Sequence, residues 1–247
     1  MILRTLWYYL VLLVSSVIHA SGAIIAGLFR VRHRPGGVYD WAGNDWGRQV
    51  LWAAGTPLRV HGLERVPAGV PVVYASNHSS MFDIWALFAS LPGSVRFVAK
   101  AEIGRVPFIG PAMVRAGHIL IERDVRKKAF EAYDRAAEQI RRGFSAIVFP
   151  EGTRSRNGDL LPFKNAPFAL AIAAQVPIVP LYVHNTFEIL PKGAWLLRPR
   201  PIDIFIGEPI PTAGLTARDR ETLRDRVRAA IEGLRGRARV DAGVGAR

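Results

Sequence analysis

Cysteine is absent from the 247 residues of this chain. Its absence excludes disulfide bonds, zinc sites with thiolate ligands and a cysteine nucleophile, and it fits a reducing compartment. Acidic residues are few, 20 against 33 lysines and arginines, which leaves a formal net charge of +13. A field of that sign attracts phosphate in nucleic acid, in anionic lipid headgroups or in a phosphorylated substrate, and composition alone leaves these three open.

Charged side chains are missing from residues 6–29, a mostly apolar run. Its 24 residues would extend about 36 Å as a helix, enough to cross a hydrocarbon core of about 30 Å. Three serines and a histidine weaken the middle of the run, so a helix that lies within one leaflet is a second interpretation. A cleaved signal peptide ending near Ala20 is a third, although the apolar run continues to Phe29.

Three arginines follow the apolar run: Arg30, Arg32 and Arg34. Positive residues beside a membrane segment favour the cytoplasmic side, so we expect the rest of the chain at the cytoplasmic face of the cell membrane. A second short helix is expected next, and it carries three tryptophans: Trp41, Trp46 and Trp52. These rings suit either a membrane interface or the protein core. Residues 1–56 are therefore predicted to form membrane-anchoring helices, as an N-terminal pair.

From Leu58 onward, short β-rich runs alternate with helical stretches. The expected strands are residues 58–63, 72–76, 95–99, 119–122, 146–149, 178–183 and 202–206. The expected helices are residues 81–91, 125–142, 165–175 and 216–235. This alternation predicts an α/β fold, with a mostly parallel or mixed sheet of about seven strands flanked by helices. The predicted domain covers residues 57–235, and residues 236–247 are expected to form a flexible basic tail.

The stretch from Val72 to Asp83, VVYASNHSSMFD, joins a predicted strand to a predicted helix. His78 and Asp83 are five positions apart, which would point them about 140° from each other on one continuous helix. They can meet only if His78 still lies in the turn. An imidazole held by a carboxylate can then serve as a general base. In the alternative, Asp83 caps the helix together with Ser80, and His78 is an ordinary turn residue.

A second predicted strand runs into a polar turn at residues 146–159, AIVFPEGTRSRNGD. Gly152 can adopt a positive φ there, and Arg154 presents a planar guanidinium that suits phosphate. The alternative is a surface loop in which the arginines pair with Glu151 and Asp159.

Two more cations follow predicted strands. Lys100 opens the segment KAEIGRVPFIG, and Arg123 comes directly after HILIE. Because the carboxyl ends of parallel strands meet at one edge of a sheet, these cations are expected to converge with Arg154 near His78.

The segments NHSSMFD, KAEIGRVPFIG, FPEGTRS and VPIVPL, in this order, resemble the four sequence blocks of the 1-acyl-sn-glycerol-3-phosphate acyltransferase family. The resemblance covers roughly residues 58–210. It implies transfer of a fatty acyl group from acyl-CoA or acyl carrier protein to the sn-2 hydroxyl of lysophosphatidic acid, giving phosphatidic acid. It further implies contact with membrane lipids, and neither a cofactor nor a metal ion.

The resemblance also implies roles for individual residues. His78 would be the general base and Asp83 the group that orients it. The glycerol phosphate would be held by three cations: Lys100, Arg154 and, in an assisting role, Arg123. Four residues would support these loops: Asn77, Glu151, Gly152 and Thr153.

Two rival functions remain at this stage. One is a related acyltransferase that acts on another lysolipid or on an amino-lipid. The other is a non-catalytic basic protein that binds anionic membranes or nucleic acid. The second rival explains the net charge but not the four blocks, so we expect no nucleic-acid partner.

Overall fold

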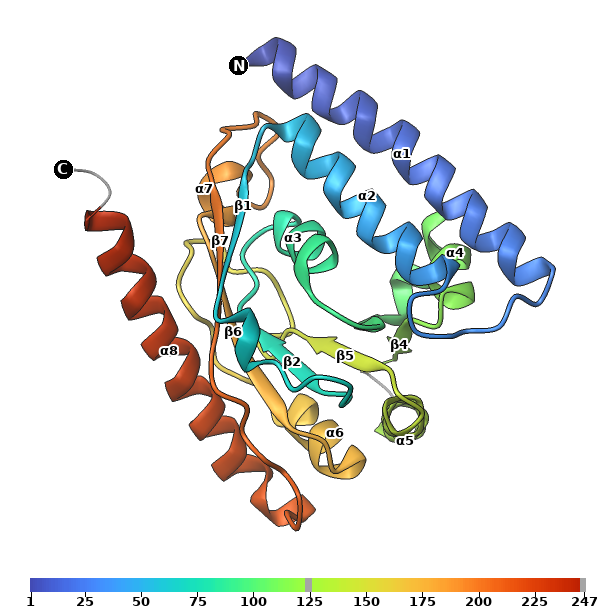
Figure 1. Ribbon diagram of the computed structural model, residues 1–247, viewed down its shortest axis with the longest axis vertical. Coiled ribbons are helices and arrows are strands. Elements are labelled where there is room, and N and C mark those ends of the chain that lie inside the picture. The colour runs from blue at the N-terminus through green and yellow to red at the C-terminus, as the bar shows by residue number, and fades with distance from the viewer. Residues whose placement is uncertain (123–125, 245–247) are drawn as a thin grey trace.

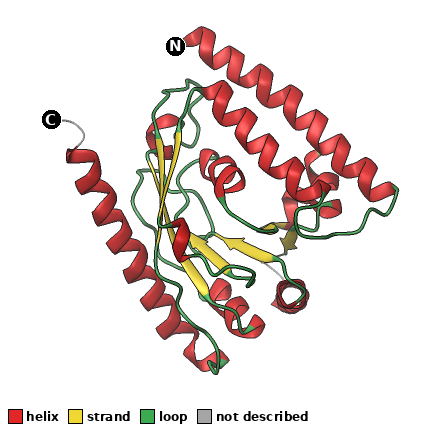
Figure 2. Ribbon diagram, viewed as in Figure 1, coloured by secondary structure: helices red, strands yellow, loops and turns green. Residues whose placement is uncertain are grey.

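The computed structural model describes residues 1–122 and 126–244, which form a seven-stranded mixed sheet covered by helices on both faces (Figures 1 and 2). The strands are β1 Leu58–His61, β2 Val73–Ser76, β3 Val95–Lys100, β4 Ile119–Ile121, β5 Ser145–Val148, β6 Ile178–His184 and β7 Ile202–Ile206. Their order is β1-β7-β6-β2-β5-β3-β4, and of these pairings only β6 with β7 is antiparallel. The expected fold class is confirmed.

The helices are α1 Ile2–Leu28, α2 Val38–Ala54, α3 Phe82–Ser90, α4 Ile109–Arg115, α5 Arg126–Arg141, α6 Ala166–Ala174, α7 Thr186–Ile189 and α8 Arg220–Val244. Short 3-10 turns lie at η1 Leu63–Arg65, η2 Ala101–Arg105 and η3 Ala217–Asp219. The predicted helices at 81–91, 125–142 and 165–175 match α3, α5 and α6 to within one residue at each end. Helices α4 and α7 were not predicted, because a run of four to seven residues is too short to show helical periodicity.

Alternate residues of the strands build two cores, one on each face of the sheet. Val73 and Ala75 of β2 pack toward α5, α6 and α8, whereas Tyr74 packs toward α1, α2 and α3. Successive side chains on a strand point to opposite faces, so a strand buried on both faces becomes apolar throughout. This is why the predicted strands appear as continuous apolar runs.

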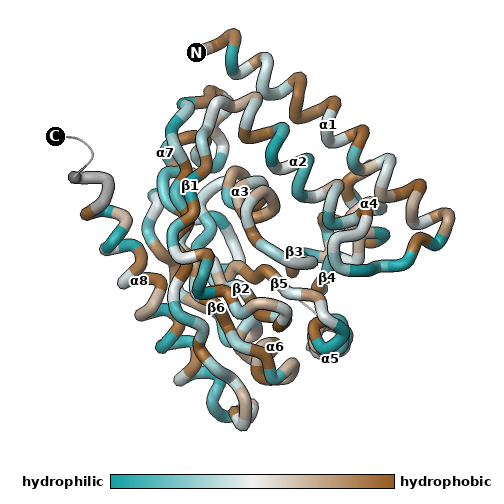
Figure 3. Tube along the Cα trace, in the orientation of Figure 1, coloured by the Kyte–Doolittle hydropathy of each residue, from teal (hydrophilic) through white to brown (hydrophobic). Residues whose placement is uncertain are grey.

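Helix α1 lies alongside α2, and α2 lies on α3 (Figure 1). The side of α1 that faces the protein carries mainly small or polar residues, including Ser15, His19 and Ala23. The outward side carries large apolar residues such as Leu3 and Leu13, and Figure 3 shows α1 as largely apolar along its length. This arrangement is the reverse of that in a helix of a water-soluble protein, because the apolar side faces outward.

The three tryptophans of α2 differ in their burial. Trp41 and Trp52 are 61% and 70% exposed, whereas Trp46 packs edge-on against Trp85 and Phe88. The core interpretation is confirmed for Trp46, and the membrane interface stays a prediction for Trp41 and Trp52.

Helix α8 continues to Val244, so the predicted helix end at residue 235 is wrong. Leu234 and Ala238 are both buried against the sheet on this stretch. Packing of one helix face stabilises a helix more than local propensity does, and it overrides the low propensity of Gly236.

A close approach of α2 to α3 depends on Gly47. A Cβ atom there would lie 2.6 Å from the carbonyl oxygen of Trp85 and 3.1 Å from the backbone nitrogen of Ala89. We expect Gly47→Ala to lower the free energy of unfolding by about 1–3 kcal/mol, because the two helices must separate.

Gly22→Ala is the matched control, because a Cβ atom on Gly22 of α1 meets nothing within 4 Å. We expect this change to be neutral or to stabilise the protein by up to about 1 kcal/mol through helix propensity. Both variants are compared by thermal unfolding in detergent. Equal stability of the two would contradict a tight contact between α2 and α3.

Candidate active site

The turn that follows β2 is fixed by the side chain of Asn77. Its Nδ2 donates a hydrogen bond to the carbonyl oxygen of Val183 (3.0 Å), and its Oδ1 accepts one from the backbone N–H of Val183 (2.7 Å). A side-chain amide has the same donor and acceptor as a peptide group, so it continues the pairing of β2 with β6 by one step. His78 therefore leaves the sheet from a rigid position.

The carboxylate of Asp83 lies at the centre of this turn and is fully buried. Its Oδ2 accepts hydrogen bonds from Nδ1 of His78 (2.8 Å) and from the backbone N–H groups of Ser79 (2.7 Å) and Ser80 (2.9 Å). The expected proximity of His78 and Asp83 is confirmed, and the carboxylate also caps the turn. Because the carboxylate holds Nδ1 as the donor, Nε2 is left as the nitrogen that can accept a proton.

Sequence reasoning missed Thr186, the first residue of α7. Its hydroxyl is fully buried and donates to Oδ1 of Asp83 (2.5 Å), and it lies 3.0 Å from the hydroxyl of Ser79. Both oxygens of the buried carboxylate therefore have donors, as a buried charge requires. No sequence signal marked Thr186: it follows β6, and only the structure shows that β6 lies beside β2.

The loop after β5 holds His78 from the opposite side. The Phe149 ring stacks on the imidazole with 3.9 Å between ring centres. Glu151 accepts hydrogen bonds from the backbone N–H groups of His78 (2.8 Å) and Leu161 (2.9 Å), and the N–H of Ser155 donates to the carbonyl oxygen of His78 (2.8 Å). One loop therefore fixes both the ring and the backbone of His78.

Ion pairing of the arginines in this loop with Glu151 and Asp159, the alternative interpretation, is wrong. Both carboxylate oxygens of Glu151 bind backbone N–H groups, and Asp159 pairs with Arg235 of α8. Within the part of the chain that the structure describes, Arg154 has no carboxylate partner. Its guanidinium is available to another anion.

Burial raises the pKa of Glu151 to about 7. The backbone N–H groups of Leu161 and His78 act in the opposite direction, and the charge of Asp83 adds to the rise. The carboxyl group that positions the backbone of His78 therefore changes its protonation state near neutral pH.

His78 opens into a cavity of about 460 Å³. Polar residues line one part of it: Lys100, Gly152, Thr153, Arg154 and Lys192. Small apolar residues of α1, α2 and α4, and one at the C-terminal cap of α4, also line it: Ala20, Ala23, Ala42, Gly43, Ala112 and Ala116. Gly152 has the positive φ expected of it, +73°. Lys192 was not predicted, because an exposed lysine in a loop gives no sequence signal.

Lys100, Arg154 and His78 thus lie around one cavity, as the convergence of strand ends predicts. Lys100 ends β3, which pairs in parallel with β5, and β5 pairs in parallel with β2. Arg123 lies outside the described residues. Among the residues that the structure does describe, no group of three histidine or acidic side chains gathers as a metal site would require.

Residues 57–184, more than half of the chain, match the acyltransferase family. The chain belongs to this family. It is 34% identical over 182 residues to the 1-acyl-sn-glycerol-3-phosphate acyltransferase of Cocos nucifera, a match that covers 73% of this chain and 58% of the relative. It is 35% identical over 180 residues to the human 1-acyl-sn-glycerol-3-phosphate acyltransferase alpha, covering 72% of this chain and 64% of that relative.

The chain thus spans about three fifths of the length of these curated relatives. Among solved structures it resembles the 1-acyl-sn-glycerophosphate (LPA) acyltransferase PlsC of Thermotoga maritima, with a TM-score of 0.79 and 26% identity. This match covers 95% of both chains, so it includes α1 and α2 together with the acyltransferase domain.

The raised pKa of Glu151 predicts a dependence of stability on pH. Between its ordinary pKa of 4.5 and about 7, the unfolded chain binds fewer protons at this residue than the folded chain does. The free energy of unfolding should therefore fall as the pH rises through this window, by roughly 3 kcal/mol from this group. Glutamine does not titrate, so in Glu151→Gln the contribution of residue 151 to the fall in the free energy of unfolding should disappear.

The measurement is the midpoint of unfolding in detergent at a series of pH values for both proteins. The two curves should differ in slope over this window, and the backbone hydrogen bond that glutamine cannot accept adds a loss of stability that does not depend on pH. Curves that run parallel over the whole window would show that Glu151 does not titrate there.

Proposed function

We propose that this protein transfers a fatty acyl group from an acyl thioester to the sn-2 hydroxyl of 1-acyl-sn-glycerol-3-phosphate, giving phosphatidic acid. The observation that carries the proposal is that His78, which is held by Asp83, lines one largely apolar cavity together with Lys100 and Arg154. The names of the relatives and of the matched structure support the same acceptor.

In the proposed reaction, Nε2 of His78 removes the proton of the acceptor hydroxyl while its oxygen attacks the thioester carbonyl carbon. The new C–O bond forms, the C–S bond breaks, and the imidazolium returns the proton to the departing thiolate. Asp83 stabilises the transient imidazolium through Nδ1, and no covalent enzyme intermediate is needed. General-base assistance of this kind accelerates reactions by about 10²- to 10⁴-fold.

The phosphate of the acceptor would bind at the cationic part of the cavity. Lys100 supplies a point charge there, and Arg154 supplies a guanidinium that can donate two parallel hydrogen bonds. Lys192 approaches the same cavity from the loop after α7 and would add a third charge. Such a site favours a phosphate monoester over an uncharged acceptor.

An acyl chain would occupy the apolar part of the cavity. Its walls come from α1, α2 and α4, and they carry alanine and glycine where larger side chains would fill the space. A Cβ atom on Gly43 would lie 2.8 Å from the ring of Phe88, so this glycine also permits the packing of the wall. Concave apolar surface with a few converging polar groups is the usual form of a lipid site.

Helix α1 would lie within one leaflet of a membrane. Near its start, the hydroxyl of Thr5 accepts a hydrogen bond from the backbone N–H of Leu197 (3.2 Å), and near its end Gly27 lies against Arg115. The helix is long and apolar enough to span a bilayer, but it is held against the domain from end to end. Insertion of its outward apolar side into one leaflet satisfies both facts.

We assign the cytoplasmic leaflet on the three arginines that follow α1, in line with the positive-inside tendency. Either acyl-CoA or acyl carrier protein would serve as the donor, with no further cofactor. An acyltransferase for another lysolipid or an amino-lipid would use the same base and cavity. The cations Lys100 and Arg154 in that cavity instead favour an acceptor with a phosphate monoester. A non-catalytic basic protein would leave the buried His78–Asp83 pair without a role.

The proposed function predicts that His78→Asn lowers kcat by at least about 10²-fold. Asparagine can still donate a hydrogen bond to Asp83, but it offers no basic nitrogen. The assay uses purified protein in detergent micelles, radiolabelled lysophosphatidate, and acyl-CoA and acyl carrier protein donors in parallel. A panel of other lysolipids and amino-lipids tests the acceptor. Turnover of His78→Asn within threefold of the wild type, at unchanged thermal stability, would disprove the mechanism.

A second prediction concerns the phosphate site. We expect Arg154→Ala to raise KM for lysophosphatidate roughly tenfold to hundredfold, because charge-assisted hydrogen bonds to the phosphate are lost. Arg156→Ala is the matched control, since Arg156 lies in the same loop but does not line the cavity. A change of similar size in both variants would show a general charge effect and remove Arg154 from the site.

A further inference from the structure

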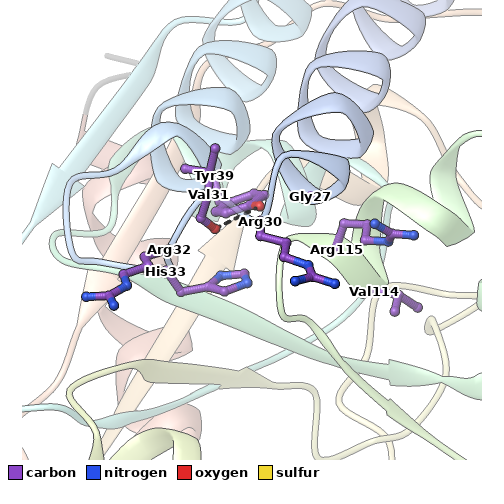
Figure 4. A pocket seen from close by; sticks show the side chains of 8 residues that line it. All are labelled: Gly27, Arg30, Val31, Arg32, His33, Tyr39, Val114 and Arg115. Carbon is purple, nitrogen blue, oxygen red and sulfur yellow. Dashed lines mark hydrogen bonds between the residues drawn. The ribbon is translucent and has the colours of Figure 1, made fainter.

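A second pocket, of about 510 Å³, lies at the C-terminal end of α1. Its cationic residues are Arg30, Arg32 and Arg115, and it also includes His33 and the exposed apolar side chains of Val31 and Val114 (Figure 4). It contains neither His78 nor the cations of the catalytic cavity. Nothing in the proposed reaction uses these arginines.

Arg30 adopts a backbone conformation that favours glycine. Its φ is +54°, and it follows the helix end at Phe29. The N–H of Arg30 donates to the carbonyl oxygen of Gly27 (3.1 Å), and the N–H of Val31 donates to that of Ala26 (2.9 Å). This pair of bonds is a Schellman motif, in which the left-handed position is usually glycine. An arginine there is strained, and residues in such conformations cluster at ligand-binding sites.

Arg115 reaches the same pocket from α4 across the last turn of α1. A Cβ atom on Gly27 would lie 2.7 Å from Cδ of Arg115 and 3.0 Å from its Cβ. The absence of a side chain at Gly27 therefore makes room for the stem of Arg115. Figure 4 shows Arg30 and Arg115 on the same side of the pocket, whereas Arg32 extends the other way.

The arginines of this pocket are not paired with acidic residues in the part of the chain that the structure describes. Residues 1–122 and 126–244 supply no carboxylate partner to Arg30, Arg32 or Arg115. Asp40, the first acidic residue of the chain, instead binds Arg96 (2.7 Å) and Ser94 (2.7 Å). Like charges that line one pocket repel one another, and a bound anion would relieve that repulsion.

His33 lines the pocket together with the arginines. Its ring stacks on Tyr39, with 4.4 Å between ring centres. Burial lowers the pKa of His33, and the positive charge of Arg96 lowers it further. These effects disfavour the charged imidazolium, and the permanent positive charge of the pocket comes from its arginines.

The surroundings of the pocket indicate which anion it meets. Phe29 is 81% exposed and Val114 is 56% exposed, and both continue the outward apolar side of α1. If α1 lies within one leaflet, as proposed above, the pocket lies at the level of the lipid headgroups. We propose that Arg30 and Arg115 bind the phosphate group of an anionic membrane lipid, at a docking site separate from the catalytic cavity.

Cosedimentation with lipid vesicles tests this site, comparing phosphatidylcholine alone with phosphatidylcholine that contains phosphatidylglycerol. We expect Arg30→Gln and Arg115→Gln each to weaken binding to the anionic vesicles about fivefold, with no change on neutral vesicles. Arg237→Gln is the matched control, since it removes the same charge from an exposed position on α8, and α8 lies away from α1 (Figure 1). If Arg237→Gln lost as much binding to anionic vesicles as the pocket variants, the effect would come from net charge alone, and the proposal would be overturned.

Two further variants separate a shaped site from a diffuse field. Arg30→Lys keeps the positive charge but loses the planar guanidinium. If the pocket is a shaped phosphate site, this variant should bind anionic vesicles more weakly than the wild type; if only a diffuse positive field acts, its binding should equal that of the wild type. Arg30→Gly relieves the strained backbone, so we expect a higher Tm together with weaker binding to anionic vesicles. Unchanged vesicle binding in both variants would overturn the proposal.

Two remaining measurements distinguish the possible failures. Inorganic phosphate, added at matched ionic strength, tests whether the pocket binds free phosphate instead of a lipid headgroup. A rise in the Tm of the wild type that is absent in Arg30→Gln, without any preference for anionic vesicles, would assign the pocket to free phosphate and overturn the lipid proposal. Turnover of Arg30→Gln in neutral detergent micelles should equal that of the wild type. A wild type that is inactive in micelles but prefers anionic vesicles through Arg30 would refute the proposed reaction and leave this site standing.

Discussion

The buried carboxylate of Asp83 is the constraint on which the rest of the site depends. A carboxylate taken fully out of water must receive hydrogen bonds on both oxygens, and here the donors come from His78, two backbone N–H groups and Thr186. Those donors belong to the turn after β2 and to the start of α7 after β6. The sheet must therefore place β2 beside β6 before the imidazole can be oriented. The orientation of His78 thus depends on the strand order.

The parallel strands at the centre of the sheet explain why the remaining groups collect there. β2, β5 and β3 are neighbours with the same direction, so the loops after them open on one edge. The loop after β5 contributes the Phe149 ring, the Glu151 carboxyl group and Arg154, while β3 ends at Lys100. Each loop contributes different groups. Because the loops open on the same edge of the sheet, these groups lie near His78 without having to reach across the molecule.

The sequence predicted the parts of this arrangement that leave a local pattern. Strand boundaries followed from β-rich runs, and the proximity of His78 to Asp83 followed from the position of a turn. The positive φ of Gly152 followed from the same reasoning. The contact of Thr186 with Asp83 could not be predicted, since 103 residues separate them and a threonine has no distinctive spacing. The end of α8 was missed because burial of Ala238 depends on the sheet, not on neighbouring residues.

Helix α1 is at once the outward apolar surface of the molecule and a wall of the cavity beside His78, through His19, Ala20 and Ala23. In the proposed function this cavity holds the acyl chain, so removal of α1 would open the proposed acyl site to water. In the proposed orientation of α1 within one leaflet, the same wall makes the cavity accessible from the lipid phase. Single-chain detergents, which resemble a fatty acyl tail, would therefore compete with it for the apolar space, and the choice of detergent becomes a kinetic variable.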